Sequence, residues 1–387
     1  MKLKQFDKTM KIIYITDCLS IWGGLERILI DKMNYLADTY DYDVHIITCC
    51  QINNPIPYPL SEKVTFHDID VLIHHQYRYK GLKRLFVRYK LNRLFYTRLK
   101  SCISQIKPDV IIGVRFGQLA AILRAKGNIP LVVESHSSCK WYQFEVHKLK
   151  DLLREKYFIH LVSKAQHVVA LTNGDANDWK EFNPHVSVIP NIVHLNDTGI
   201  YSDCNSKSVI FVGRFAKQKD IGALIKVWTI VNKKHPDWKL NIYGGYGDQY
   251  DELHSLLENP SLNIYVHEPT LDIFKEYINS SILLLTSLYE PFGLVLPESM
   301  SCGLPVVAFD CPFGPADIIT DSVDGFLIHD RNIDEFAEKV CLLMSDEQLR
   351  KKMGKAGIKS SQRYQGSLIM PKWDNLFKML KENSSTD

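Results

Sequence analysis

Two neighbouring stretches say most about the fold of this chain: Ser281-Ile282-Leu283-Leu284-Leu285-Thr286 and Glu290-Pro291-Phe292-Gly293-Leu294-Val295-Leu296-Pro297-Glu298. The apolar run is typical of a buried parallel strand, and the residues that follow predict a short helix with Pro297 at its first position. Two glutamates therefore flank a glycine turn at the carboxyl end of a strand. In open α/β sheets ligands bind at that edge, because loops leave the sheet there and helix N-termini point amide hydrogens outward. The pattern favours a nucleotide or phosphorylated ligand.

The same alternation of apolar strand runs and helical patterns continues along the whole chain. A length of 387 residues exceeds what one hydrophobic core usually supports, so two domains are expected. A turn-rich stretch, 190–207, separates two sets of βαβ patterns, which predicts an α/β fold with two Rossmann-like, doubly wound domains at 1–190 and 191–368. The strand runs that support this prediction are 12–16, 44–48, 110–112, 131–133, 168–171, 208–213, 240–243, 262–266, 281–286, 306–309 and 325–328.

Composition excludes several classes of protein. The chain is 45% hydrophobic and 24% charged, as in ordinary soluble globular proteins, and no apolar run approaches the roughly 20 residues of a spanning helix. The N-terminus is too polar for a signal peptide, so we expect a cytoplasmic protein. Nine cysteines lack the spacing of zinc ligands, and we expect them to be reduced.

Charge is divided unevenly along the chain. Residues 1–190 hold 27 Lys and Arg against 18 Asp and Glu, whereas 191–387 hold 20 against 26. Nine cations and no acidic residue lie in 78–100, interleaved with large apolar residues, which predicts an amphipathic helix on an anionic membrane surface. No nucleic-acid motif accompanies this segment, so nucleic acid is not expected as a partner. The alternative is a solvated helix that packs on its own domain.

Two cations follow the strand run that begins at Ser208. Arg214 and Lys219 stand five residues apart, and fixed cations in a partly dry cleft stabilise the charge that develops on a departing nucleoside diphosphate. Arg214 can form a fork across two phosphate oxygens, while Lys219 acts as a point charge. The alternative is a pair of solvated cations at a helix start, where they would oppose the helix dipole.

Two further motifs in the first half follow strand runs. Gly23 and Gly24 lie between the first strand run and the first helix, where backbone without side chains can approach anionic oxygens, although a Gly-Gly pair also makes ordinary turns. His136 follows the run 131–133, and its imidazole can form a hydrogen bond with a sugar hydroxyl. A lone histidine is more often structural.

These motifs together resemble glycosyltransferase family 4, the retaining nucleotide-sugar transferases with the two-domain GT-B fold. The stretch from Glu290 to Glu298 is similar to the family's E-x7-E signature. The resemblance implies that Glu290 lies beside the donor sugar and that Glu298 accepts hydrogen bonds from the ribose hydroxyls. It also implies that the amides of Phe292, Gly293 and Leu294 approach the donor sugar or phosphate.

Other elements appear in the family's order. Gly213-Arg214 and Lys219 resemble the G-R-x4-K element that binds the donor diphosphate. Gly23-Gly24 resembles the loop against which the phosphates rest, and His136 resembles the histidine near the donor sugar. Gly244 resembles a glycine loop of the second domain, although it also suits an ordinary turn. Asp220 and Asp317 depart from the glycine and glutamate that many relatives carry there. The GT-B plan further implies that the two domains face each other across a cleft and that a helix in 369–387 crosses back to the first domain.

The resemblance implies an enzyme without cofactor or metal, with Glu290 and His136 as catalytic residues. It would move a hexose or N-acetylhexosamine from a nucleotide sugar, most simply a UDP-sugar, to a saccharide acceptor. The loop 311–319 and the basic segment suggest a lipid-linked acceptor in surface-polysaccharide assembly, at the inner face of the membrane. The alternatives are a soluble acceptor, a non-catalytic GT-B scaffold, a glycoside hydrolase, and a metal-dependent transferase that uses D-x-D at 41–43 or 68–70.

Overall fold

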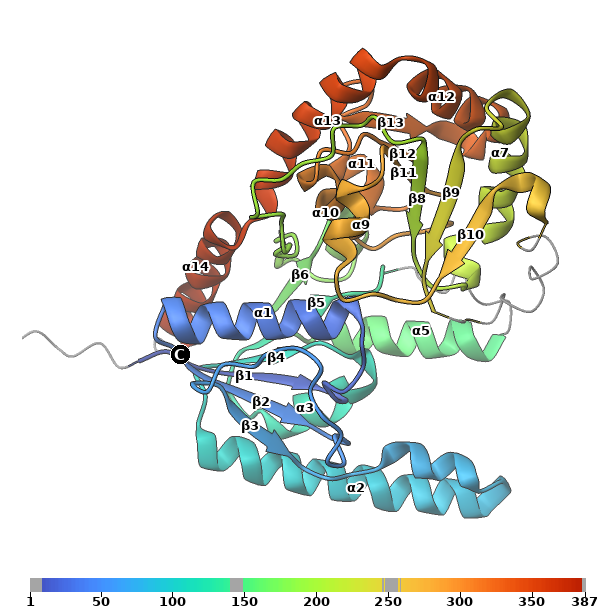
Figure 1. Ribbon diagram of the computed structural model, residues 1–387. Helices are drawn as coiled ribbons and strands as arrows, with labels where there is room; N and C mark the ends of the chain where they lie inside the picture. Colours follow the sequence, from blue (N-terminus) through green and yellow to red (C-terminus); the bar gives the residue numbers. More distant parts are fainter. Residues whose placement is uncertain (1–8, 140–148, 246, 248–256, 258, 385–387) are drawn as a thin grey trace, which may run out of the picture. The chain divides into compact units, whose positions relative to one another are not determined.

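The computed structural model describes residues 9–139, 149–245, 247, 257 and 259–384 (Figure 1). The chain forms two compact units. Unit 1 comprises Met1–Leu171, Asp175–Ile192 and Gly366–Asp387, and unit 2 comprises Thr172–Gly174 and Val193–Gln365. Each unit contains one parallel sheet with helices packed on it, so the prediction of two doubly wound α/β domains is confirmed.

Unit 1 is built on a seven-stranded sheet with the order β3-β2-β1-β4-β5-β6-β7. Every pair in it is parallel, and the inner strands are buried along their length, which is why their sequences are continuous apolar runs. The strand order reverses direction between β1 and β4. The strands are β1 (Lys11–Thr16), β2 (Asp43–Thr48), β3 (Thr65–Asp68), β4 (Val110–Gly113), β5 (Leu131–Ser135), β6 (His167–Ala170) and β7 (Val186–Val188).

Helices cover both faces of this sheet. Figure 1 shows α1 and α14 against one face and α2 against the other, and a separate apolar cluster fills each side. The helix α14 follows unit 2 in the sequence but packs into unit 1 through Trp373 and Phe377. The helices are α1 (Gly24–Thr39), α2 (Gly81–Ile106), α3 (Leu119–Ala125), α5 (Leu149–Val162), α6 (Asn173–Lys180) and α14 (Gly366–Ser384).

Unit 2 is built on a six-stranded parallel sheet with the order β10-β9-β8-β11-β12-β13, which reverses between β8 and β11. Its core lies between the sheet and the helices α7 and α12. The strands are β8 (Ser208–Val212), β9 (Lys239–Tyr243), β10 (Ile264–His267), β11 (Ile282–Leu285), β12 (Val306–Phe309) and β13 (Gly325–Ile328). The helices are α7 (Ile221–Lys234), α9 (Ile273–Ile278), α10 (Val295–Ser301), α11 (Gly314–Ile318), α12 (Ile333–Ser345) and α13 (Glu347–Ser361).

Short 3-10 turns complete the described structure at Ile73–Arg78, Phe116–Gln118, Lys217–Lys219, Pro260–Leu262, His329–Arg331 and Gln362–Tyr364. Among the helices of the described residues, none combines the length and the apolar character required to cross a bilayer.

The main departures from the sequence predictions concern edges and helix starts. The strands β3 and β7 lie at the two edges of the first sheet and are only partly buried, so they lack the apolar run that identified the inner strands. The helix α10 begins at Val295, which makes Pro297 its third residue rather than its first. A proline is tolerated there because the amides of a helix's first turn have no intrahelical acceptor.

Candidate active site

The carboxyl edge of the unit 2 sheet gathers the cations and carboxylates that the sequence singled out. The loop after β8 carries Arg214 and Lys219, and the loop after the neighbouring strand β11 carries Glu290. The strand order reverses between these two strands, and ligands of open α/β sheets bind at such a switch point. The sheet order thus brings together residues that lie far apart in the sequence.

Lys219 and Glu290 form an ion pair at this edge. Lys219 Nζ lies 2.6 Å from Glu290 Oε2, and the Ser287 hydroxyl donates a second hydrogen bond to the same oxygen at 3.0 Å. The side chains of Lys219 and Glu290 are 15% and 10% exposed. Because both charges are largely removed from water, they interact more strongly than a surface pair does.

The loop that carries Glu290 is held by its own backbone. The Glu290 amide donates to the Pro312 carbonyl at 2.6 Å, and the amide of Gly314 donates to the Glu290 carbonyl at 2.8 Å. Gly314 is required for this contact, since a Cβ atom there would lie 1.8 Å from the Phe292 carbonyl oxygen. The position of the Glu290 carboxylate therefore depends on the loop after β12 as well as on its own strand.

Three successive amides in the same loop are available to a ligand. The backbone N–H groups of Phe292, Gly293 and Leu294 donate to no acceptor among the described residues. Gly293 has a φ of +93°, a conformation that glycine adopts without strain. Glu298 lies in the first turn of α10, where it is buried and accepts a hydrogen bond from the Tyr277 hydroxyl at 3.5 Å.

Arg214 differs from Lys219 in having no carboxylate partner. Its side chain is exposed, and it forms no ion pair or hydrogen bond with a described residue. The start of its loop packs closely on the loop after β9, because a Cβ atom on Gly244 would lie 1.9 Å from the Gly213 carbonyl oxygen. Tyr246 and Asp248 of that glycine loop lie outside the described residues.

Arg331, which the sequence did not single out, ties these loops together. Its guanidinium donates to Asp220 Oδ2 at 2.5 Å and to the carbonyl oxygens of Ser287 and Thr286 at 2.8 and 3.1 Å. It also stacks over the Phe309 ring at 4.3 Å. A guanidinium presents several donors in fixed directions, which suits Arg331 to joining two loops. Nothing in its local sequence signals the role, because its partners lie on other strands.

In unit 1 the glycine pair lies at the equivalent edge of the first sheet. Gly23 is the N-cap of α1, and Gly24 is the first residue of that helix. A Cβ atom on Gly23 would lie 2.5 Å from a carboxylate oxygen of Glu26, so the loop lies close to this buried acid. Arg115, which follows β4, donates to the other oxygen of Glu26 at 3.2 Å. The glycines thus stand at the point where the strand order of this sheet reverses.

His136 lies in a buried charged group that the sequence reasoning missed in part. Its Nε2 atom lies 3.1 Å from Glu134 Oε1, and the same oxygen forms an ion pair with Lys32. Burial lowers the pKa of His136, and it outweighs the attraction of Glu134, which would raise that pKa. Burial opposes the charge on Glu134, but Lys32 and His136 hold the pKa of this carboxyl well below its usual value. Lys32 could have been found from its position four residues after Ile28, on the apolar face of α1.

The two D-x-D sequences are engaged in local contacts. Asp68 accepts hydrogen bonds from the Thr48 hydroxyl and from the amides of Gln51 and Ile52, and Asp43 forms an ion pair with Lys11. Within the part of the chain that the structure describes, no group of three or more His, Cys, Asp or Glu has the arrangement of a metal site.

Two doubly wound sheets, one with a cation–carboxylate pair at its switch point, define a nucleotide-binding α/β class. Two family models narrow this class: "Glycosyltransferase Family 4" matches residues 22–197, and "Glycosyl transferases group 1" matches residues 200–360. The chain therefore belongs to the family-4 type of glycosyltransferase and has the GT-B fold.

Individual proteins support this assignment. The amylovoran biosynthesis glycosyltransferase AmsD of Erwinia amylovora is 29% identical over 384 residues, which cover 95% of this chain and 99% of AmsD. A Staphylococcus aureus TarM variant, crystallised with UDP and sugars, has a TM-score of 0.77 at 18% identity and covers 95% of this chain and 100% of its own. HepE of Anabaena, solved with UDP and glucose, has a TM-score of 0.72 at 20% identity, and the match covers 95% of this chain and 99% of HepE.

Proposed function

We propose that this protein is a retaining glycosyltransferase that moves a hexose or N-acetylhexosamine from a UDP-sugar to a saccharide acceptor in surface-polysaccharide biosynthesis. The observation that carries the proposal is the Lys219–Glu290 pair at the switch point of the second sheet, close in sequence to Arg214, whose side chain has no partner among the described residues. This arrangement offers a cation to phosphate and a carboxylate to sugar at one sheet edge.

The proposed chemistry follows from these charges. Arg214 and Lys219 stabilise the negative charge that builds up on the departing diphosphate, while the amides of Phe292, Gly293 and Leu294 donate to the donor's oxygens. The acceptor hydroxyl attacks the anomeric carbon from the face that the diphosphate leaves, so the bond to the phosphate oxygen breaks and that oxygen takes the acceptor's proton. The anomeric configuration is retained.

The remaining site residues are given supporting roles. Glu290 orients the donor sugar, and Glu298 accepts hydrogen bonds from the ribose hydroxyls of the donor. His136 forms a hydrogen bond with a sugar hydroxyl, and the loop at Gly23 and Gly24 lies against the phosphates. The UDP in the TarM and HepE structures supports uracil as the base of the donor, and the place of AmsD in amylovoran biosynthesis supports a polysaccharide product.

Donor binding is tested first by thermal unfolding with UDP and a panel of nucleotide sugars. A ligand at 100 times its Kd should raise the midpoint of unit 2 by about 5–10 °C. Arg214→Ala should keep the unliganded midpoint, since Arg214 has no described partner, but should lose most of the shift. The matched control is Lys217→Ala, which removes another exposed cation of the same loop. Equal shifts in the two variants would contradict the diphosphate role of Arg214.

Transfer is tested with the donor that binds best. The anomeric configuration of the product, read from its proton coupling constant, should match that of the donor. Glu290→Ala should abolish transfer, and the reaction should tolerate EDTA. An inverted product would refute the retaining mechanism, and loss of activity with EDTA would restore the metal-dependent alternative.

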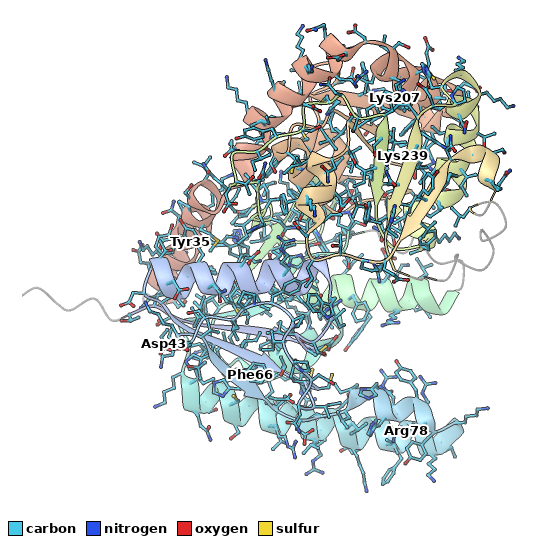
Figure 2. All side chains as sticks on the ribbon, viewed as in Figure 1. Tyr35, Asp43, Phe66, Arg78, Lys207 and Lys239 are labelled. Carbon is cyan, nitrogen blue, oxygen red and sulfur yellow. The ribbon has the colours of Figure 1, made fainter. Side chains whose placement is uncertain are left out.

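The exposed part of α2 supports a membrane-bound acceptor. Leu82, Leu85, Phe86 and Tyr89 lie on one face of the helix and are 85%, 59%, 58% and 63% exposed. Only the second half of the helix, from Phe95 on, contributes buried side chains. Figure 2 shows Arg78, just before α2, well away from Phe66 of the sheet.

We propose that this face of α2 binds anionic lipid at the inner face of the cytoplasmic membrane, where a lipid-linked saccharide would serve as acceptor. Nine Lys and Arg lie in 78–100, of which Arg98 is held by the carbonyl oxygens of Ile69 and Asp70, and a cation near such a surface contributes about 1 kcal/mol. The protein should therefore float with vesicles that contain phosphatidylglycerol and not with pure phosphatidylcholine. Leu85→Gln with Phe86→Gln should abolish flotation without changing the UDP shift, and unaltered flotation would refute the proposal.

A further inference from the structure

Lys32, Glu134 and His136 form a buried chain of ionisable side chains in unit 1, and the proposed reaction gives a role only to His136. Lys32 comes from α1, Glu134 comes from the end of β5, and His136 directly follows that strand. Lys32 is 0% exposed and Glu134 is 1% exposed, and one carboxylate oxygen contacts both Lys32 Nζ and His136 Nε2. Burying three ionisable groups together is costly unless they compensate one another.

Aromatic side chains close the Lys32 end of this chain. The ammonium lies over the rings of Trp373 at 4.9 Å and Tyr14 at 5.8 Å. Trp373 belongs to α14, so the C-terminal helix seals the base of the chain from water. With water excluded, the charge on Lys32 can be neutralised only by Glu134, its one carboxylate partner in the described part of the chain.

The geometry also determines which nitrogen of the His136 ring a substrate can reach. Nε2 is buried against Glu134 Oε1, and the side chain as a whole is only 9% exposed. The Nε2–Oε1 contact is not aligned as an ideal hydrogen bond, so its effect is electrostatic: an N–H dipole directed at the carboxylate is favoured over a lone pair. Nδ1 is therefore the ring nitrogen that remains for a substrate.

We propose that the Lys32–Glu134 pair is a positioning device that holds His136 as the neutral Nε2–H tautomer, which leaves Nδ1 to accept a hydrogen bond from a substrate hydroxyl. The use of His136 by substrate rests on the function proposed above. The pair carries no net charge, so it orients the imidazole without requiring its protonation. Without Lys32, the negative charge of Glu134 would favour protonation of the His136 ring.

The loop that carries His136 is anchored in the same region. Asp175 of α6 accepts hydrogen bonds from the Ser135 hydroxyl at 2.9 Å and from the Cys139 amide at 2.6 Å. These residues flank His136 on both sides in the sequence, so the backbone has little freedom to move the ring away from Glu134.

Three charged groups act on His136, and they determine the direction in which its pKa should move when one of them is removed. Glu134 raises the pKa of His136, whereas Lys32 and Arg115 lower it, and Tyr14 interacts electrostatically with Glu134. Lys32→Met should therefore raise the pKa of His136, because the carboxylate is no longer neutralised. Glu134→Gln should lower it further, because the only favourable partner of the imidazolium is lost. These opposite shifts follow from the charges alone and check the electrostatic contacts, whereas the ring tautomer distinguishes a positioning role from simple stabilisation of the fold.

The test is nitrogen-15 NMR of histidine-labelled full-length protein, with the His136 signals identified by their loss in His136→Gln. Wild type should show one dominant tautomer with the proton on Nε2. The pKa of His136 should move upwards in Lys32→Met and downwards in Glu134→Gln. Lys381→Met is the matched control, since it removes a cation that pairs with Asp109 rather than Glu134, and it should leave the His136 signals unchanged.

A further variant covers the case in which a single substitution prevents folding. Lys32→Met with Glu134→Leu replaces the ion pair by apolar groups of similar size, which cores usually tolerate. In this variant His136 should become a mixture of tautomers, and kcat should fall by about 10- to 100-fold. An unchanged dominant tautomer in that variant, or a wild-type ring protonated on Nδ1, would overturn the proposal.

The NMR results decide the positioning role even if no transfer is detected. If the tautomer and pKa shifts appear as expected while kcat is unchanged, the positioning role is supported, and it is the contact of His136 with substrate in the proposed function that fails. Failure of the two proposals is therefore distinguishable.

Discussion

The strongest test of the unit 2 site is to remove the cation of its buried pair while keeping the side-chain stem. Lys219→Met preserves the packing of the aliphatic chain on Gly213, where a Cβ atom would lie 3.3 Å from the lysine stem. It leaves the Glu290 carboxylate with only the Ser287 hydroxyl as a described partner. The variant should lose both stability and affinity for UDP.

The magnitude of the stability loss follows from distance and burial. At 2.6 Å and an effective dielectric constant near 20, the gross Coulomb attraction is about 6 kcal/mol. Desolvation offsets much of this attraction, and leaving one buried charge unpaired typically costs roughly 3–5 kcal/mol. The side chains of Lys219 and Glu290 are 10–15% exposed, so we expect Lys219→Met to lower the free energy of unfolding by an amount at the lower end of this range, about 3 kcal/mol. Loss of a charged hydrogen bond to phosphate should weaken UDP binding roughly 10- to 150-fold.

The assay combines urea unfolding with calorimetric titration of UDP. Lys219→Met with Glu290→Gln should recover the stability to within about 1 kcal/mol of wild type, because no unpaired charge remains. UDP binding should stay weak in this double variant. Lys351→Met is the matched control: Lys351 and Glu347 also form a close ion pair in unit 2, but their side chains are 33% and 49% exposed. Lys351→Met should lower the free energy of unfolding by no more than about 0.5 kcal/mol and leave UDP binding unchanged.

Two results would refute this reasoning. A Lys219→Met protein as stable as the control would mean that the ion pair is effectively solvated. Wild-type UDP affinity in Lys219→Met would show that Lys219 serves Glu290 alone and that the diphosphate is held elsewhere.

Three further predictions follow from other contacts. Gly314→Ala should cost more than about 2 kcal/mol in urea unfolding, since its Cβ would lie 1.8 Å from the Phe292 carbonyl oxygen. Arg331→Lys keeps the charge but loses the fork that joins Asp220 to the β11 loop, so kcat/KM should fall about tenfold in steady-state assays. Because the pKa of Glu134 is lowered on folding, its stabilisation is fully present above its ordinary value of 4.5 and is lost as the pH falls below it, which urea unfolding at pH 7 and pH 3 would detect.

A control variant or a contradicting outcome belongs to each of these predictions. Gly117→Ala adds a Cβ with nothing within 4 Å and should change stability by less than about 0.5 kcal/mol. An Arg331→Lys enzyme with wild-type kcat/KM would show that charge alone suffices at that position. Lys32→Met with Glu134→Leu should lose less stability in acid than wild type does, and an equal loss would assign the acid sensitivity to other carboxyl groups.

Much of the fold was predictable because its signals are local. Inner strands of parallel sheets are buried on both faces, so β11 and β12 appear as short apolar runs that any reader of the sequence can find. The edge strand β3 was not found, because only one neighbouring strand pairs with it and its four residues are exposed or half-buried, with Phe66 as the single apolar one. The start of α10 was displaced by two residues, since a proline marks the first turn of a helix without specifying the position within it.

The chain's own sequence determined that chemistry-bearing residues follow strands: Arg214 and Lys219 after one, Glu290 after another, and His136 after a third. Only the tertiary structure decided which of them meet. Lys219 contacts Glu290 across 71 residues, and Lys32 contacts Glu134 across 102, because sheet order and helix packing bring these elements together. Local patterns encode the period of a helix or strand. Which charges pair depends on burial in the folded protein, because an unpaired charge in a core carries a large desolvation cost.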